Sequence, residues 1–341
     1  MQASVGSSAE SLVTAVGDFL ESLGAVRWGP LGLALLLFLV YLSLRARALF
    51  HILRAAYPGT PIPFRRVWGA YVAAYGFNNV IPARGGDVVK LFLTRGSVPT
   101  ATYPAVAAAF VVELGFDAVM GVAILTFAFS QGVFPRPPEL PRLPSLDLQV
   151  LQAHPKLALV LLASLALAAV VAFVVLSGRV RAFWARVGQG LAILADRKRY
   201  LREVFLVQLV GWGFRFAAFW LLLEAFGVGG SVRNVLLVLG VAAVSALVPF
   251  TPGGAGVQQA LLVTVFAGAA PGATVAAYSV GQQVAVATLT LGVGFLALVG
   301  IFRIRSFREV LRLGRAERMA DRGGVGARAA SAGPGAPRAP G

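Results

Sequence analysis

Long apolar runs are the feature that most constrains this chain. Each run is long enough to cross a bilayer core of about 30 Å as a helix, which takes about 20 residues. In lipid, the backbone N–H and C=O groups of a run must pair inside the segment, as they do in a helix. The sequence therefore predicts an all-α, polytopic membrane helix bundle. Five runs qualify, at about residues 29–45, 101–130, 156–177, 203–226 and 274–301.

Composition supports this class and excludes several others. Hydrophobic residues make up 58% of the 341 residues and charged residues 13%, against roughly 45–50% and about 25% in soluble domains. The 30 lysines and arginines outnumber the 14 acidic residues, but they cluster between the apolar runs, which indicates anionic lipid and not nucleic acid as the partner. With no cysteine and two histidines, we expect no disulfide, metal centre or cofactor.

Two further apolar regions, residues 67–95 and 234–269, are interrupted at their centres. The first interruption reads IPARGGD at 81–87 and the second VPFTPGGAG at 248–256, so that each places a glycine pair a few residues after a proline. The apolar pieces on either side have about 8–16 residues, or about 12–24 Å as helix, and most are too short to span. We expect each region to form a helical hairpin.

The distribution of basic residues predicts the orientation, because cytoplasmic loops are enriched in lysine and arginine. Acidic residues precede the first basic residue, Arg27, so the first apolar run is not expected to be a cleaved signal peptide. The basic linker 178–202 is expected either along the cytoplasmic headgroups or as a solvated connector. We expect a plasma-membrane protein with residues 45–66, 178–202 and 303–341 in the cytoplasm and residues 1–28, 131–155 and 227–233 outside.

A chain changes sides only by crossing the membrane, so the sides of the loops determine where each interrupted region begins and ends. The first must begin and end on the cytoplasmic side and the second on the outer side. We expect both to be re-entrant hairpins of opposite direction. Two thin membrane spans in each region would satisfy the same loop assignments. Span, hairpin and span recur upside down, which is an inverted-topology repeat of the kind found in transporters. The expected organisation is an N-terminal segment 1–28, a first repeat 29–130, a connector 131–202, a second repeat 203–302 and a largely disordered tail 303–341.

Few ionisable residues lie inside apolar segments, where each costs roughly 2.5–3.5 kcal/mol. Glu113 and Asp117 share one helix face at spacing i, i+4, and Arg84 is expected to face them. One hypothesis is that Arg84 and Lys90 bind an anionic headgroup while Asp87, Glu113 and Asp117 hold the cation in place or relay protons. The alternative is a structural ion pair that fixes the hairpin to its neighbour.

The interruptions supply further candidate groups. Their glycines permit positive φ and expose N–H groups at the start of a helix, which suits an anion, although a tight turn or close packing would need glycine equally. Asn78 and Asn79 are expected to cap backbone groups or to contact a headgroup, and Arg215 is expected to pair with Glu224, reach toward the interface or line the cavity. The remaining candidates for substrate binding are Gly85, Gly86, Thr251, Gly253, Gly254, Gln258 and Gln259, with Gly256 beside them.

The segment 79–87, followed by Glu113 and Asp117 and then by residues 249–256, resembles the lysylphosphatidylglycerol synthase transmembrane-region family, also called flippase-like. The resemblance covers about residues 30–305. It implies a bacterial or archaeal membrane protein that moves, or helps to move, a charged lipid between leaflets. Two positions depart from the family pattern: Leu114 replaces an arginine, and Gln258-Gln259 replaces a charged pair, which argues against a charged site built from both halves.

The expected function is translocation of an anionic phospholipid, aminoacyl-lipid or polyprenyl-linked lipid, without enzymatic activity. No soluble synthase domain follows the apolar region, so we expect any lipid-synthesising enzyme to be encoded separately. Two alternatives stay open. One is a non-transporting partner of a lipid or cell-envelope synthase, and the other is an intramembrane enzyme that acts on a lipid phosphate.

Overall fold

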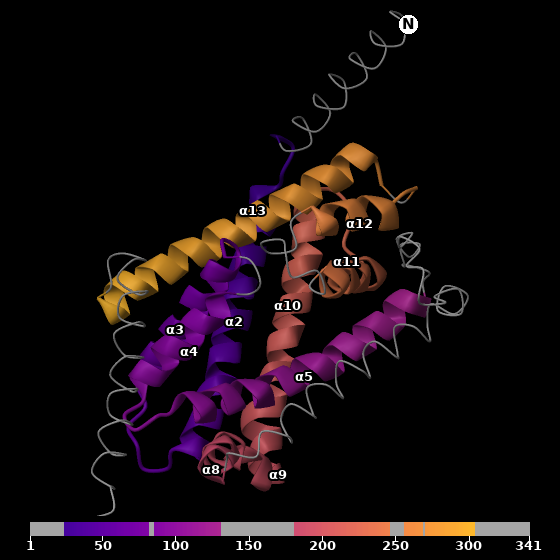
Figure 1. Ribbon diagram of the computed structural model, residues 1–341. Helices are drawn as coiled ribbons and strands as arrows, with labels where there is room; N and C mark the ends of the chain where they lie inside the picture. The colour runs from indigo at the N-terminus through magenta and orange to yellow at the C-terminus, as the bar shows by residue number, and fades with distance from the viewer. Residues whose placement is uncertain (1–23, 82–84, 131–180, 246–255, 269, 304–341) are drawn as a thin grey trace, which may run out of the picture.

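The computed structural model describes residues 24–81, 85–130, 181–245, 256–268 and 270–303. Regular structure in these ranges is helical throughout (Figure 1). The elements are α2 (Trp28–Ala56), α3 (Phe64–Asn78), α4 (Gly86–Ser97), α5 (Tyr103–Ser130), α8 (Arg181–Gly190), the 3-10 turn η1 (Ala192–Ala195), α9 (Arg197–Tyr200), the π-helical turn η2 (Leu201–Phe205), α10 (Leu206–Ala225), α11 (Val232–Ser245), α12 (Val257–Val265), α13 (Gly272–Ala297) and the π-helical turn η4 (Leu298–Phe302).

Helices of membrane-spanning length account for four of the five predicted spans. The fifth, residues 156–177, lies outside the described residues. The first helix differs from expectation, because α2 does not end near residue 45 but continues to Ala56. The chain is thus a membrane protein with several apolar helices. Those long and apolar enough to cross are Trp28–Ala56, Tyr103–Phe127, Arg197–Ala225 and Gly272–Phe302.

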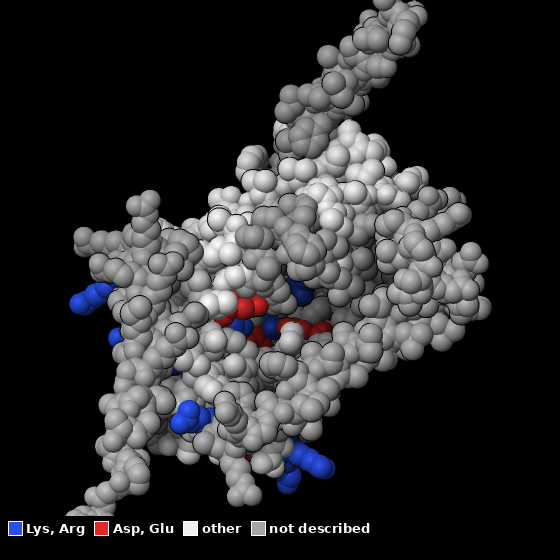
Figure 2. Space-filling view, in the orientation of Figure 1, with Lys and Arg blue, Asp and Glu red and all other residues white. Residues whose placement is uncertain are grey.

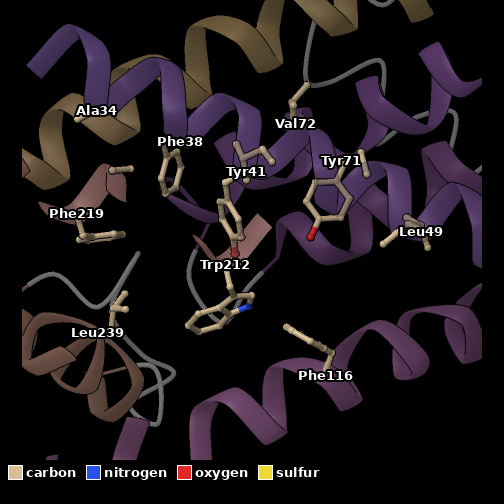
Figure 3. Close-up of a cluster of buried hydrophobic side chains, with 14 of the residues drawn as sticks. Ala34, Phe38, Tyr41, Leu49, Tyr71, Val72, Phe116, Trp212, Phe219 and Leu239 are labelled. Atoms are coloured by element: carbon tan, nitrogen blue, oxygen red, sulfur yellow. The ribbon is translucent and has the colours of Figure 1, made fainter. Parts of the chain in front are cut away.

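Helices α2 and α10 form an antiparallel pair. At one end, the Arg27 N–H donates to the carbonyl of Ala225 at 2.9 Å. At the other end, His51 Nδ1 lies 3.3 Å from Glu203 Oε2. Between these ends the two helices pack through their aromatic side chains, and Figure 3 shows Phe38 beside Phe219, with ring centroids 6.4 Å apart.

Helices α3 and α4 form a hairpin whose two ends lie at the same end of the bundle. Arg65, near the start of α3, donates to the carbonyl of Gly300 at 3.5 Å, and after α4 the Thr102 N–H donates to the Tyr57 hydroxyl at 3.2 Å. The 15 and 12 residues of α3 and α4 reach about 22 and 18 Å, short of a bilayer core of about 30 Å.

In the first glycine pair, Gly86 owes its place to packing, which was the alternative considered above. Gly85 has a φ of −58°, and Gly86 is the first residue of α4, so neither uses the positive φ that glycine permits. A Cβ on Gly86 would instead collide with the backbone of α3 at Ala74 and Asn78. Close contact between the two arms of the hairpin therefore requires glycine at position 86.

Helices α11 and α12 flank the second interruption, and they contain 14 and 9 residues. The turn between them lies outside the described residues, together with Thr251, Gly253 and Gly254. Gly256 has a φ of 86°, in the region that favours glycine, as expected from the sequence. Its N–H donates to Gln259 Oε1 at 2.6 Å, and Gln259 Nε2 donates to the side chain of Gln283 on α13.

The described part of the basic linker packs across one end of the bundle. Gln189 on α8 donates to the carbonyl of Ala56 at 3.0 Å, and a Cβ on Gly190 would meet the backbone of Ala105 on α5. The end of α2 and the linker, both assigned to one side from their charge, thus lie together. The start of α2 and the end of α10 lie together at the other end.

Candidate functional site

Two carboxylates and two cations meet inside the helix bundle. Glu113 and Asp117 project from α5 at the i, i+4 spacing that places them on one face, as the sequence predicts. Arg45 comes from α2 and Lys90 from α4. These four residues, Arg45, Lys90, Glu113 and Asp117, are called the charged cluster below.

Arg45 binds both carboxylates. Its Nη2 donates to Glu113 Oε1 and to Asp117 Oδ2, each at 2.6 Å, and its Nη1 donates to Asp117 Oδ1. The side chain is 6% exposed, so the pairing takes place out of water, where an uncompensated charge would be costly. The sequence interpretation placed Arg45 at the start of a loop, and this was wrong because α2 continues past it to Ala56.

Lys90 and Tyr71 complete the surroundings of Glu113. Lys90 Nζ lies 3.3 Å from Glu113 Oε2 and sits over the rings of Phe110 and Tyr71, 4.2 and 4.8 Å from their centroids. The Tyr71 hydroxyl accepts from Arg45 Nε at 2.9 Å and donates to Glu113 Oε1. Both oxygens of Glu113 therefore have charged or hydroxyl partners, and its side chain is 2% exposed.

Asp117 is the more accessible carboxylate of the charged cluster. Its side chain is 28% exposed, and the indole Nε1 of Trp212 on α10 donates to it at 3.4 Å. Figure 2 shows acidic and basic side chains gathered in a hollow at the centre of one face. Two positive and two negative side chains make the charged cluster neutral, which reduces the cost of holding it among apolar helices.

Arg215 on α10 lies one turn beyond Trp212. Its Cζ sits 4.6 Å from the Trp212 ring, 5.6 Å from the Tyr41 ring and 5.8 Å from the Phe219 ring. Figure 3 shows these three aromatic side chains on neighbouring helices. Glu224, considered above as its partner, binds Arg27 and the N–H of Gly230 instead. Within the described ranges, no carboxylate oxygen lies within 4.0 Å of the Arg215 guanidinium.

The asparagines before the first interruption connect the hairpin to other elements. Asn79 Nδ2 donates to the carbonyl of Tyr75 at 3.2 Å, which is the predicted capping, and to Thr290 Oγ1 on α13 at 3.0 Å. Asn78 Nδ2 lies 3.4 Å from Asp87 Oδ1. These contacts fix the tip of the first hairpin against the middle of α13.

The structure brings together only part of the predicted site. Lys90, Glu113 and Asp117 meet, whereas the predicted partner Arg84 lies outside the described residues, and Arg45 occupies both carboxylates. Gln258 is half-buried at the start of α12, and Gln259 binds α13. The sequence interpretation missed Arg45, Tyr71 and Trp212. For Arg45 the signal was present, because buried apolar residues continue beyond it with helical spacing at Ala46, Leu49, Phe50, Ile52 and Leu53.

Comparison with known proteins gives one match. A family model described as the lysylphosphatidylglycerol synthase TM region matches residues 5–294. The matched range contains the four members of the charged cluster, Trp212, Arg215 and both interrupted regions. No curated protein and no solved structure matches the chain significantly.

Proposed function

Since this chain belongs to the lysylphosphatidylglycerol synthase transmembrane-region family, we propose that it translocates a lipid with an anionic headgroup between the leaflets of the plasma membrane. The headgroup crosses through the charged hollow while the acyl chains stay in the bilayer.

The observation that carries the proposal is the charged cluster itself. Four ionisable side chains inside an apolar bundle cost folding free energy even when they pair. Such residues are therefore rare in membrane segments, and where they occur they commonly line a binding site or a pathway. Asp117 is 28% exposed while Glu113 is enclosed, so the charged cluster is most accessible at Asp117. A polar wall of this kind gives a headgroup hydrogen-bond partners that the lipid interior lacks.

The placement of the interrupted regions supports a path through the middle of the bundle. Asn79, at the tip of the first hairpin, binds Thr290 on α13, and Gln259, just after the second interruption, binds Gln283 on the same helix. Two helical turns, about 10 Å, separate Thr290 from Gln283. This supports two re-entrant hairpins that approach each other from opposite faces, as in transporters with inverted repeats.

Transport fits the carboxylates better than catalysis does. A general acid or base needs a carboxyl group within reach of the substrate. Glu113 is enclosed and bound on both oxygens by Arg45, Lys90 and Tyr71, so it does not reach a substrate, and the ion pair with Arg45 favours Asp117 as a hydrogen-bond acceptor for a headgroup. We therefore propose that the chain binds and moves its lipid without a chemical step.

Leaflet exchange in liposomes tests the proposal. The purified full chain is reconstituted with a fluorescent phosphatidylglycerol, and dithionite reduction reports the fraction of probe in the outer leaflet. Complete bleaching is expected with the wild-type chain, because exchange carries inner-leaflet probe outward, whereas about half of the probe resists bleaching in empty liposomes. Asp117→Asn should slow exchange strongly, and Arg66→Gln, an exposed charge on α3, should leave it unchanged. Exchange equal to that of empty liposomes would refute translocation.

The orientation is proposed from the basic residues, with the linker end of the bundle in the cytoplasm. Because the sequence has no cysteine, single-cysteine variants report sidedness without background. Arg66→Cys should react with an impermeant maleimide only after the cells are opened, and Ser231→Cys should react in intact cells. The reverse labelling pattern would show that the proposed orientation is wrong. It would not bear on transport, which the liposome assay tests.

A further inference from the structure

We propose that Arg215 forms a phosphate-binding site on α10, and that this site together with Asp117 selects phosphodiester headgroups with a hydrogen-bond donor at the far end. The inference rests on the proposed function and deepens it, because it names what is recognised in the headgroup: its anionic phosphate, which phosphatidylglycerol and phosphatidylethanolamine share, and a donor beyond it. Glycerol hydroxyls and a primary ammonium are the two common sources of such donors.

The guanidinium of Arg215 is held in a fixed position. The rings of Tyr41, Trp212 and Phe219 lie within 5.8 Å of its Cζ and hold it by cation–π attraction. Buried aromatic side chains on α2 and α10 provide this cage, so Arg215 is positioned before any ligand arrives. A positioned arginine loses little conformational freedom when it binds an anion.

The same guanidinium has unused hydrogen-bond donors. A guanidinium has five N–H donors, and rings satisfy its charge but not these donors. The Nε of Arg215 is buried without a hydrogen-bond partner, and no carboxylate in the described part of the chain pairs with the side chain. Arg45, one turn along α2 from Tyr41, is by contrast fully engaged. Arg215 therefore has the donors that a phosphate oxygen pair needs, in a planar arrangement.

Trp212 connects Arg215 to the charged cluster. Trp212 presents its ring to Arg215 and its N–H to Asp117, so one indole separates a positive group from a partly exposed carboxylate. A headgroup with its phosphate on Arg215 would place its terminal group toward Asp117. A hydroxyl or a primary ammonium can donate to that carboxylate, whereas the trimethylammonium of choline cannot. We expect phosphatidylglycerol and phosphatidylethanolamine to bind more tightly than phosphatidylcholine.

Native mass spectrometry of the full chain in detergent tests both halves of the site. Phosphatidylglycerol, phosphatidylethanolamine and phosphatidylcholine with identical acyl chains are added at matched concentrations. Arg215→Gln should weaken binding of all three by about ten- to a hundredfold, as expected for lost charge-assisted hydrogen bonds, and Arg215→Lys should restore part of it. Asp117→Asn should reduce the preference for the two donor-bearing lipids over phosphatidylcholine. Arg66→Gln is the matched control.

The outcomes separate this site from the transport proposal. Unchanged lipid binding in a folded Arg215→Gln chain, with wild-type leaflet exchange, would refute the site and leave translocation standing. Binding that depends on Arg215 in a chain that shows no exchange would support the site and refute translocation. Thermal unfolding of each variant establishes folding, and Arg215→Gln is suited to this because it leaves every hydrogen bond of the charged cluster in place. If phosphatidylcholine binds as well as the other two lipids, donor selection by Asp117 is wrong.

Discussion

Replacing Arg45 with alanine tests whether one buried arginine balances the two carboxylates of α5. The wild-type guanidinium donates to Glu113, to Asp117 and to the Tyr71 hydroxyl. Without it, the charged cluster keeps one cation, Lys90, for two anions. We expect the variant to be strongly destabilised, because a charge left without its partner in a buried site costs more than the intact pair contributes.

The size of the effect follows from exposure. Breaking a buried ion pair by removing one partner costs about 3–5 kcal/mol in the free energy of unfolding. Glu113 is enclosed, at 2% exposure, but it keeps Lys90 and Tyr71, while Asp117 is 28% exposed and can gain water. Both facts favour the lower end of the range, about 3 kcal/mol. Arg45→Lys should cost about 1–2 kcal/mol, because an ammonium cannot bridge two carboxylates as a planar fork does.

Unfolding by SDS in mixed micelles, followed by the fluorescence of the five tryptophans, gives these free energies. Arg66→Ala removes an exposed arginine and should stay within about 0.5 kcal/mol of wild type. An Arg45→Ala chain that unfolds within about 1 kcal/mol of wild type would refute the reasoning, since Asp117 and Glu113 would then be accommodated without Arg45. A larger loss in Arg45→Lys than in Arg45→Ala would refute it as well.

Three further perturbations address the hairpin and the ends of the bundle. Gly86→Ala should destabilise by about 1–3 kcal/mol in the same titration, because its Cβ collides with α3, whereas Gly96→Ala, with no atom within 4 Å, should be neutral or slightly stabilising. Asn79→Leu removes the hydrogen bond to Thr290, and leaflet exchange should fall more than stability does if the hairpin tip positions the path. Arg27→Ala breaks an ion pair whose side chains are 57% and 36% exposed, so it should cost about 0–1 kcal/mol, and salt should reduce even that in SDS titrations at two ionic strengths.

The membrane class and most of the spans could be predicted from the sequence, because hydropathy is a property of each segment by itself. The sequence also predicted that the end of α2 and the basic linker lie on the same side, because the charge of a loop can be read without knowing how the helices pack. The shared face of Glu113 and Asp117 also followed, because helical period is local. The connector span at 156–177 and the second glycine pair stay predictions.

The identity of the residue that faces those carboxylates was decided only by tertiary structure. Arg45 lies far from Glu113 in sequence, and nothing in the spacing of either helix says that α2 packs against α5. Hydropathy ended the first span at Arg45 because a charge there resembles a loop, whereas burial against two carboxylates allows the helix to continue.

The requirement for glycine at position 86 was likewise decided by tertiary structure. It comes from the close approach of α3 and α4, and the backbone conformation of Gly86 is one that any residue can adopt. The sequence by itself determined which segments enter the membrane and which helix faces are polar. Which polar faces meet depends on packing between distant segments, and only the folded chain decides that.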